Sequence, residues 1–300
     1  MIQTRSQTAV RTATSPLQAL GDVVALGKPR LSGMVVTTAA AGLWLAPERI
    51  AAPRAAAFLV GTGMVVGAAN VLNNYFERDV DGLMRRTWSR PLPARRVDPG
   101  TALALGMALP AFALPLLALA ANTLTALLAL VAVVTYAFVY TPLKRVSTAA
   151  LFVGAVPGAI PPLMGWTAAT GRIDAPGLAL FALLFVWQIP HFLAISIYLK
   201  EDYARGGLKV FALVHGERAA KRWAVATSAL LVPVGMLPWG LGMANGWYGA
   251  AAALLGLALT AIAAVGLRTE DGAARWARSY FLSTLLYLTL VFIALFLGAR

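Results

Sequence analysis

Long stretches without a single charged residue dominate this sequence. They cover 31–47, 55–76, 99–143, 146–171, 175–199, 223–267 and 279–299. A transmembrane helix needs about 20 mostly apolar residues, so the two longest stretches can each hold two helices and a turn. Ala121-Asn122-Thr123 and Asn245-Gly246 supply the residues for those turns. The pattern predicts an all-α, polytopic membrane protein with nine transmembrane helices in one bundle. A soluble fold is excluded because none needs seven such stretches.

Lysine and arginine gather on one side of this predicted bundle. With the N-terminus inside, the inward segments are the N-terminal tail and the loops at 77–98, 141–145, 200–222 and 268–278, and they hold every Lys and Arg except Arg49, Arg54, Arg172 and Arg300. Such an excess marks the cytoplasmic side of a membrane protein. The net charge of +13 is then explained by topology and by anionic lipids, so no nucleic-acid partner is expected. We expect a multi-pass protein of the bacterial cell inner membrane, with its N-terminus and active site cytoplasmic.

The sequence predicts two parts, a short N-terminal segment and one membrane domain. Residues 1–29 are predicted to form an N-terminal cytosolic arm and interfacial segment, and residues 30–300 a single nine-helix domain. The absence of cysteine excludes disulfides and thiolate metal sites. The two longest inward loops, 77–98 and 200–222, lie on the same face, and long loops in a compact protein are usually functional. We expect them to border a cytosol-facing intramembrane cavity.

A polar cluster lies where the second span reaches the cytosol. Asn73, Glu77 and Asp81 are spaced i, i+4 and i+8, which places three oxygen-bearing side chains on one helical face, and Asn70 adds a fourth. Mg²⁺ prefers such oxygens and keeps room for substrate phosphates. The alternative for any single residue here is a charged juxtamembrane loop. Polar groups together at this depth usually serve function, so the set predicts a Mg²⁺ site.

Basic residues follow the cluster and also end the fourth span. Guanidinium groups bind phosphate oxygens in a bidentate manner, and Lys144 shares a helical face with Tyr140. The alternative for Tyr140, Lys144 and Arg145 is an aromatic belt residue followed by charges that set topology. The residues proposed to bind a diphosphate are Arg85, Arg86, Arg90, Lys144 and Arg145.

The fifth and sixth spans carry further unusual residues. Pro157, Pro161 and Pro162, with nearby glycines, are expected to break the fifth helix or open its backbone at a buried or cavity-lining position. In the sixth span His191 lies within an apolar run beside Trp187 and Gln188. A buried histidine there is either structural or part of a site.

Several of these segments together resemble the protohaem IX farnesyltransferases, the haem branch of the UbiA-type intramembrane prenyltransferase superfamily. The similar segments run from position 70 to 217: Asn73-Asn74-Tyr75 to Asp81, Arg86-Thr87 with Arg90-Pro91-Leu92, Tyr140 to Arg145, Pro157 to Pro162 and Trp187 to Phe192, ending with Asp202-Tyr203 and Gly206. Glu77 and Ala150 depart from the family, which has Asp and often Asn at those positions.

The resemblance implies transfer of a farnesyl group from farnesyl diphosphate to a vinyl group of haem B, with addition of water, to give haem O. Mg²⁺ on Asn73, Glu77 and Asp81 would be the cofactor, with Tyr140 and Lys144 as further catalytic residues. Farnesyl diphosphate, haem B and the bilayer would be partners, with proteins of haem A synthesis or cytochrome oxidase assembly. The resemblance implies that the haem or the prenyl group is bound by Tyr136, Trp187, Gln188, His191, Glu201 and Asp202. Glu201 and Asp202 could also bind a second metal ion or help to activate water.

Two other functions stay open at this point. A prenyltransferase for an aromatic quinone precursor shares the first acidic motif, but the segment from Trp187 to Phe192 argues against it. A transporter would place its charged groups near the bilayer midplane, whereas these acids cluster at the cytosolic end.

Overall fold

The computed structural model describes residues 15–269 and 273–299, and helices make up nearly all of that part of the chain. Residues 1–14 of the predicted N-terminal segment lie outside the described residues. In chain order the elements are α1 (Pro16–Leu26), α2 (Pro29–Leu45), α3 (Ala52–Asp81), α4 (Pro99–Ala120), α5 (Thr123–Val134), η1 (Thr135–Tyr140), α6 (Thr141–Leu143), α7 (Ala150–Thr170), α8 (Ala175–Tyr198), α9 (Lys200–Arg205), α10 (Phe211–Val214), α11 (Glu217–Gly240), α12 (Gly246–Val265), η2 (Gly266–Arg268) and α13 (Ala273–Gly298).

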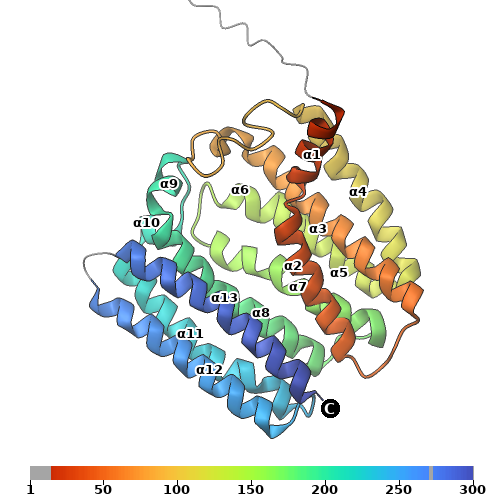
Figure 1. Ribbon diagram of the computed structural model, residues 1–300, viewed down its shortest axis with the longest axis vertical. Coiled ribbons are helices and arrows are strands. Elements are labelled where there is room, and N and C mark those ends of the chain that lie inside the picture. The colour runs from red at the N-terminus through yellow and green to blue at the C-terminus, as the bar shows by residue number, and fades with distance from the viewer. Residues whose placement is uncertain (1–14, 270–272, 300) are drawn as a thin grey trace, which may run out of the picture.

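The chain is an all-α polytopic membrane protein. In the described part, eight helical segments are long and apolar enough to cross a bilayer, rather than the nine predicted. The remaining candidate, α2, has 17 residues, which lies at the lower limit for a span. It nevertheless packs along α7 and α3 within the bundle (Figure 1).

The two turns predicted inside the longest apolar stretches are confirmed. Asn122 caps α5, where its side chain accepts a hydrogen bond from the Thr125 amide at 2.9 Å. Asn245 caps α12 in the same way through the Tyr248 amide at 3.1 Å. Asparagine is favoured at this position because its side-chain oxygen satisfies an amide that has no partner in the first helical turn.

The expectation that the prolines break the fifth span is wrong, because α7 runs unbroken from Ala150 to Thr170. Neighbouring helices surround it, and a buried transmembrane helix tolerates proline when its surroundings satisfy the freed backbone groups. Glycines of both helices allow α2 and α7 to pack closely. A Cβ on Gly42 would lie 1.9 Å from the Pro162 carbonyl oxygen, and one on Gly165 would lie 2.0 Å from the Ala39 oxygen.

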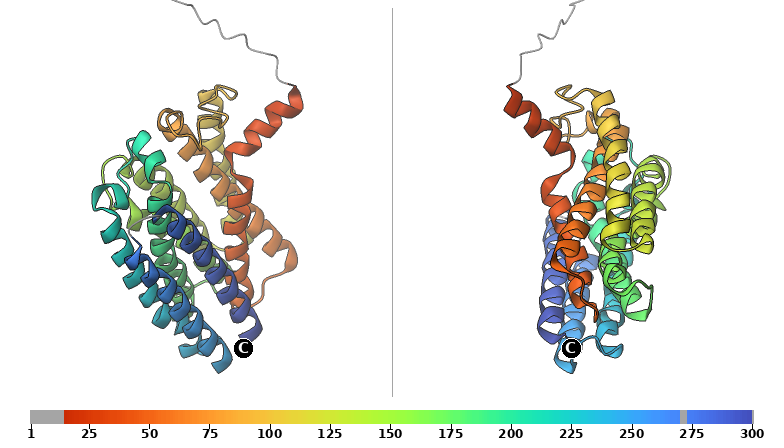
Figure 2. Two further views of the ribbon diagram at one scale, coloured as in Figure 1. Left: turned by 60° about the vertical axis from the view of Figure 1, so that its left-hand side comes forward. Right: turned by 90° about the vertical axis from the view of Figure 1, so that its right-hand side faces the viewer.

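The helices form two groups that meet along α7 and α8. α3 packs against α4, and α11 packs against α12 and α8, with α13 also against α8. At one end of the bundle lie the loop after α3, the short helices α9 and α10, and α1 (Figure 1). Figure 2 shows α1 leaning away from the main body at that same end.

The length of α3 places the polar cluster at this end. Its 30 residues extend about 45 Å, whereas the hydrocarbon layer is about 30 Å thick. The last turns of α3 therefore extend beyond the apolar layer and carry Asn73, Glu77 and Asp81 to the rim of the bundle.

The close α2–α7 contact generates a stability prediction. Replacing Gly42 by Ala forces the two backbones apart and should lower the free energy of unfolding by about 1–3 kcal/mol. Gly33→Ala, in the same helix with nothing within 4 Å of its Cβ, is the control and should leave stability unchanged. Thermal denaturation of the detergent-solubilised variants measures both, and equal melting temperatures would contradict this account of the contact.

Candidate active site

Two buried carboxylates of α3 are paired with cations from other segments. The Glu77 Oε1 atom lies 2.5 Å from Lys144 Nζ, and Asp81 Oδ2 lies 2.7 Å from Arg90 Nη1. Asn73 completes the face by donating to Glu77 Oε2 at 2.8 Å. All five side chains line one cavity of about 290 Å³. The i, i+4, i+8 spacing on α3 has thus produced a common face with three oxygen-bearing side chains.

Lys28 also lines this cavity, although the sequence did not point to it. Its ammonium donates to Asn73 Oδ1 at 2.8 Å. The residue has a left-handed backbone, with φ of 48° and ψ of 62°, a conformation that costs a non-glycine residue about 1–2 kcal/mol. Pro29 follows as the first residue of α2, a position that suits its fixed φ.

Asparagines of α3 hold the turn that carries Lys28. Asn74 Nδ2 donates to the Leu26 carbonyl at 2.8 Å, and Asn70 Nδ2 donates to Ser32 Oγ at 3.1 Å and to the Gly27 carbonyl at 3.4 Å. The predicted role of Asn70 as a fourth oxygen on the metal face is therefore wrong, since its amide is directed at the α1–α2 turn.

A π-helical turn shapes the opposite wall. The segment η1 lets Thr141 Oγ1 donate to the Tyr136 carbonyl at 2.8 Å and accept from Asn73 Nδ2 at 3.2 Å. Tyr136 and Tyr140 both line the cavity, and the Lys144 ammonium lies 4.7 Å from the centre of the Tyr140 ring. Single π-turns inside helices occur frequently at functional sites.

The electrostatics of the cavity favour a polyanion. Its wall has five cationic side chains, Lys28, Arg86, Arg90, Lys144 and Lys209, against the two carboxylates. Burial opposes the charged form of Lys144, but the Glu77 carboxylate outweighs it and raises the pKa of Lys144. Burial, followed by the charge of Arg90, lowers the pKa of Lys28 to about 7. An added anion would relieve this repulsion between the cations.

An apolar cavity of about 220 Å³ continues from the polar one. Both share Leu31, Tyr136, Tyr140 and Phe192. Small residues of α7 make room around it, because a Cβ on Gly158 would lie 2.0 Å from Gln188 Oε1 and one on Gly154 would lie 2.5 Å from the Tyr140 ring. Besides the shared residues, the wall consists mainly of Val35, Val65, Val66, Ala69, Ala132, Val133, Pro157, Pro161 and Met164.

Arg145 lies apart from the cavity. Its guanidinium binds Asp79 Oδ1 and Oδ2 at 2.8 and 2.9 Å and the Phe76 carbonyl at 2.6 Å. Arg145 follows Lys144 directly, and successive side chains of a helix are rotated by about 100° around its axis. Arg145 therefore binds an exposed carboxylate and does not line the polar cavity, so its position does not support the predicted phosphate contact.

Asp202 connects the two long loops that the sequence predicts to face the cytosol. It accepts hydrogen bonds from the Arg85 amide at 2.8 Å and the Arg86 amide at 3.2 Å, and from Arg205 at 2.5 Å. Burial opposes its ionised form, but these hydrogen bonds lower the pKa of Asp202. Asp202 thus positions the backbone beside Arg86 instead of facing Glu77 and Asp81.

Arg85, Glu201 and Asp202 line a separate, larger cavity of about 1060 Å³, which shares Arg86 with the polar cavity. The resemblance assigned Glu201 and Asp202 to a second metal or to water, but neither residue lines the polar cavity that holds Asn73, Glu77 and Asp81. Within the described residues, no group of three or more His, Asp or Glu side chains is placed to hold a metal.

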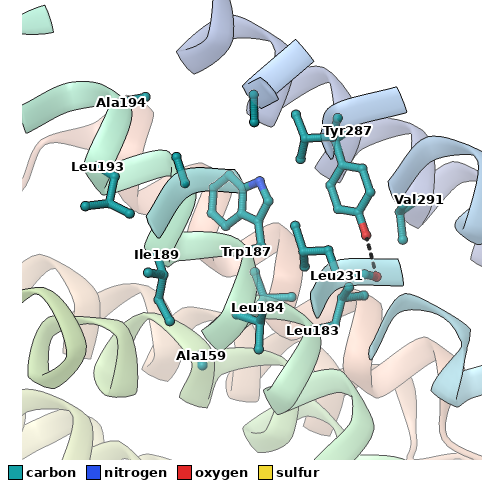
Figure 3. Close-up of a cluster of buried hydrophobic side chains, with 14 of the residues drawn as sticks. Ala159, Leu183, Leu184, Trp187, Ile189, Leu193, Ala194, Leu231, Tyr287 and Val291 are labelled. Carbon is teal, nitrogen blue, oxygen red and sulfur yellow. Dashed lines mark hydrogen bonds between the residues drawn. The ribbon is translucent and has the colours of Figure 1, made fainter. Parts of the chain in front are cut away.

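Trp187 and His191 pack into the apolar core of the bundle. The Trp187 indole donates to the Thr284 carbonyl at 2.7 Å, and His191 Nδ1 lies 2.8 Å from Thr284 Oγ1. Figure 3 shows Trp187 among aliphatic side chains and Tyr287. Gln188 and Phe192 are each one residue further along α8, which turns them by about 100° towards the cavities. The role assigned to Trp187 and His191 in binding haem or prenyl is therefore unsupported by their position.

The residues on α3 fit a Mg²⁺ ion shared with a diphosphate. Asn73, Glu77 and Asp81 offer an amide oxygen and two carboxylates on one face. Mg²⁺ commonly takes one or two carboxylates, and substrate phosphates and water complete its shell. Three further residues of the site were missed from the sequence: Lys28, Thr141 and Tyr203. The sequence signal at Lys28 was a lysine directly before Pro29, shortly ahead of the first apolar stretch. No spacing in the sequence linked this lysine to α3.

The role of Asp202 can be tested against its neighbour. Asp202→Ala should loosen the backbone at Arg86 and weaken the binding of magnesium pyrophosphate about tenfold, because it removes hydrogen bonds to a charged group. Glu201→Ala, an exposed carboxylate, should bind as the wild type does. Isothermal titration measures both, and equal losses in the two variants would contradict a positioning role for Asp202.

Comparison with known proteins places the chain among prenyltransferases. Residues 34–297 match the family described as the UbiA prenyltransferase family. A protein of Anaeromyxobacter sp. (strain Fw109-5) named protoheme IX farnesyltransferase is 63% identical over 292 residues, covering 97% of this chain and 98% of that protein. A protein of the same name from Myxococcus xanthus (strain DK1622) is 48% identical, covering 91% and 93%.

Solved structures share the fold at low sequence identity. A digeranylgeranylglyceryl phosphate synthase superposes with a TM-score of 0.79 at 17% identity, covering 94% of this chain and 98% of that one. A UbiA homologue from Archaeoglobus fulgidus, bound to DMAPP and Mg²⁺, superposes with a TM-score of 0.63 at 17% identity, covering 93% and 98%. The sequence match over most of the chain decides the matter: this protein belongs to the UbiA prenyltransferase family.

Proposed function

We propose that this protein transfers the farnesyl group of farnesyl diphosphate to a vinyl group of protohaem IX, with addition of water, to give haem O and diphosphate. The observation that carries the proposal is the pairing of a cationic cavity, which holds Asn73, Glu77 and Asp81, with an apolar cavity that continues from it. The relatives named protoheme IX farnesyltransferase, up to 63% identical over nearly the whole chain, supply the acceptor.

Asn73, Glu77 and Asp81 would hold the metal. When bound, Mg²⁺ would act as a Lewis acid that stabilises the negative charge developing on the leaving diphosphate. The structure of a UbiA homologue bound to DMAPP and Mg²⁺ supports this assignment. Lys144 and Arg90 pair with two of these ligands and therefore already lie where phosphate oxygens would be bound.

The cations stabilise the charge that leaves with the diphosphate. As the allylic C1–O bond breaks, both bonding electrons go to the diphosphate oxygen, and Lys144, Arg86 and Arg90 stabilise it electrostatically. C1 of the farnesyl group bonds to the terminal carbon of the vinyl group. Water adds to the other vinyl carbon and loses a proton, which completes the hydroxyethylfarnesyl side chain.

The apolar cavity suits the prenyl chain. It begins at Tyr136 and Tyr140 beside the polar cavity and reaches Thr62 of α3. Thr62 lies eleven residues before Asn73 in the same helix, which corresponds to about 16 Å. The tyrosine rings separate the charged head from the chain and offer π-electrons near a developing allylic cation.

The larger cavity suits the acceptor. It holds about 1060 Å³ and shares Arg86 and Tyr203 with the polar cavity. Arginine and lysine side chains lie beside an apolar wall that includes Leu213 and Phe281. A porphyrin with an apolar body and two carboxylates needs this combination of surfaces.

The topology follows from the same proposal. α2 would be the ninth span, since it packs within the bundle against α7, and both cavities would open towards the cytosol. The excess of lysine and arginine in its loops supports an orientation with that end inside a bacterial cell. The chain would then lie in the inner membrane, with both amphipathic substrates reaching it from the cytosolic leaflet.

Removing one proposed metal ligand tests the chemistry. Asp81→Asn should lower the rate of haem O formation by at least about a hundredfold, because removing one preorganised electrostatic group costs about that much. Asp79→Asn, an exposed carboxylate of the same helix paired with Arg145, is the control and should keep its activity. Mass spectrometry of extracted haems, after confirming membrane insertion, measures the product. Near-wild-type turnover of Asp81→Asn would contradict the metal assignment.

The same assay tests the acceptor. Membranes containing the wild-type protein are supplied with farnesyl diphosphate, Mg²⁺ and either haem B or a hydroxybenzoate, and the lipid extracts are analysed. We expect farnesylated haem and no prenylated aromatic acid. The reverse result would identify a quinone-precursor prenyltransferase.

The apolar cavity makes a separate prediction. Val66→Phe should fill part of it and raise KM for farnesyl diphosphate about tenfold, while geranyl diphosphate, one isoprene unit shorter, is used nearly as before. Val60→Phe is the matched control, because Val60 lies on α3 but is 58% exposed on the outer surface. Equal effects on the two donors would show that the chain binds elsewhere.

A further inference from the structure

Lys28 differs from the other cations of the polar cavity in its partners. Lys144 and Arg90 each have a carboxylate within 2.7 Å. In the described part of the chain, Lys28 forms no ion pair, and its ammonium donates only to the neutral amide oxygen of Asn73. Lys28 is partly buried. An ammonium withdrawn from water without a carboxylate is costly, so an additional anion in the cavity would be bound favourably.

We propose that Lys28 is a substrate-binding residue, whose ammonium binds the diphosphate of the prenyl donor from the side of α1 and α2. The inference rests on the proposed function and adds to it a residue from the segment that the sequence assigned to an N-terminal arm. Lys28 enters the cavity from the turn before α2 and Lys144 from the end of α6, so the two lysines would bind the anion from different segments.

The partner of Lys28 is itself a proposed metal ligand. Asn73 Oδ1 accepts from Lys28, and the same oxygen would ligate Mg²⁺ when the metal and diphosphate bind. The Lys28 ammonium would then lose Asn73 as its acceptor. Among the other groups lining the cavity, both carboxylates already have cations, and the substrate anion is the partner that remains for Lys28.

The backbone at Lys28 is strained, and this strained conformation directs the Lys28 side chain into the cavity. Lys28 has a positive φ although it is not a glycine. The Ser32 hydroxyl donates to the Gly27 carbonyl at 2.6 Å, and Asn74 donates to the Leu26 carbonyl at 2.8 Å. Strained residues that are held by surrounding hydrogen bonds concentrate at ligand-binding sites. Ser32 and Asn74 are accordingly positioning residues for Lys28.

The turn is also anchored from outside the cavity. Arg96, in the loop after α3, binds Asp22 of α1 at 3.0 Å, and Arg90 of the same loop lies 3.5 Å from Asn74 Oδ1. The loop that supplies Arg90 to the cavity therefore also holds the helix that precedes Lys28. Both cations are positioned by one connected set of contacts.

The test measures binding of magnesium with inorganic pyrophosphate to the full-length protein in detergent, by isothermal titration. Lys28→Gln keeps a donor for Asn73 but removes the charge, and it should weaken binding by about ten- to a hundredfold. Lys28→Arg should restore most of the affinity. Arg30→Gln, which removes an exposed charge two residues away, should bind as the wild type does.

Further variants separate charge from structure. Ser32→Ala should weaken binding in the same direction as Lys28→Gln, and the double variant should be no weaker than Lys28→Gln alone. In the enzymatic assay, Lys28→Gln should raise KM for farnesyl diphosphate and leave KM for haem B unchanged. Thermal denaturation identifies any variant that loses affinity because it unfolds. If Lys28→Gln unfolds, Lys28→Met is tested in its place.

The outcomes distinguish this inference from the proposed function. Wild-type affinity in folded Lys28→Gln would overturn the role of Lys28, whatever the acceptor. Pyrophosphate binding that depends on Lys28, in a protein that makes no haem O, would overturn the proposed acceptor and leave the inference intact. No pyrophosphate binding by the wild-type protein would overturn both.

Discussion

The carboxylates near the end of α3 are buried, and a buried charge is tolerated only when it is paired. Glu77 is paired with Lys144, which follows the fourth span, and Asp81 with Arg90, from the loop after α3. The first pair joins segments that are far apart in sequence, and the second fixes the loop that follows α3 against the helix. This end of the bundle is organised by these contacts, because the loop and the end of the fourth span have to approach α3 to satisfy its charges.

The two joined cavities match the two chemically different parts of the proposed donor, a charged diphosphate and an apolar chain. Cations surround the polar cavity, and mostly aliphatic side chains surround the apolar one, with Tyr136 and Tyr140 at the junction. Glycines of α7 provide the space, since a Cβ at Gly154 would enter the Tyr140 ring. The unusual composition of α7 thus reflects close packing against α2 and the tyrosines, while the helix itself stays continuous.

Sequence periodicity correctly predicted which side chains share a face of one helix. It did not predict which face of a helix meets the cavity. The common face of Asn73, Glu77 and Asp81 follows from a rotation of about 100° per residue. The same rotation separates Gln188 from Trp187 and Lys144 from Arg145, but the sequence does not say which of two adjacent faces meets the cavity. Similarity to a family groups adjacent residues in one motif, and it therefore assigned Trp187 and His191 to a site that they do not line.

The sequence by itself determined the membrane class, the order of the apolar segments, the end of the bundle that carries most of the lysine and arginine, and the acidic face of α3. These properties depend on hydropathy, on charge and on local helical spacing, all of which are read within a short stretch of chain. The tertiary structure decided which cations meet the carboxylates, that Asp202 holds a loop backbone, and that Lys28 enters the cavity 45 residues away in sequence from Asn73. Such contacts depend on helix packing and on a strained turn, and neither leaves a periodic signal in the sequence.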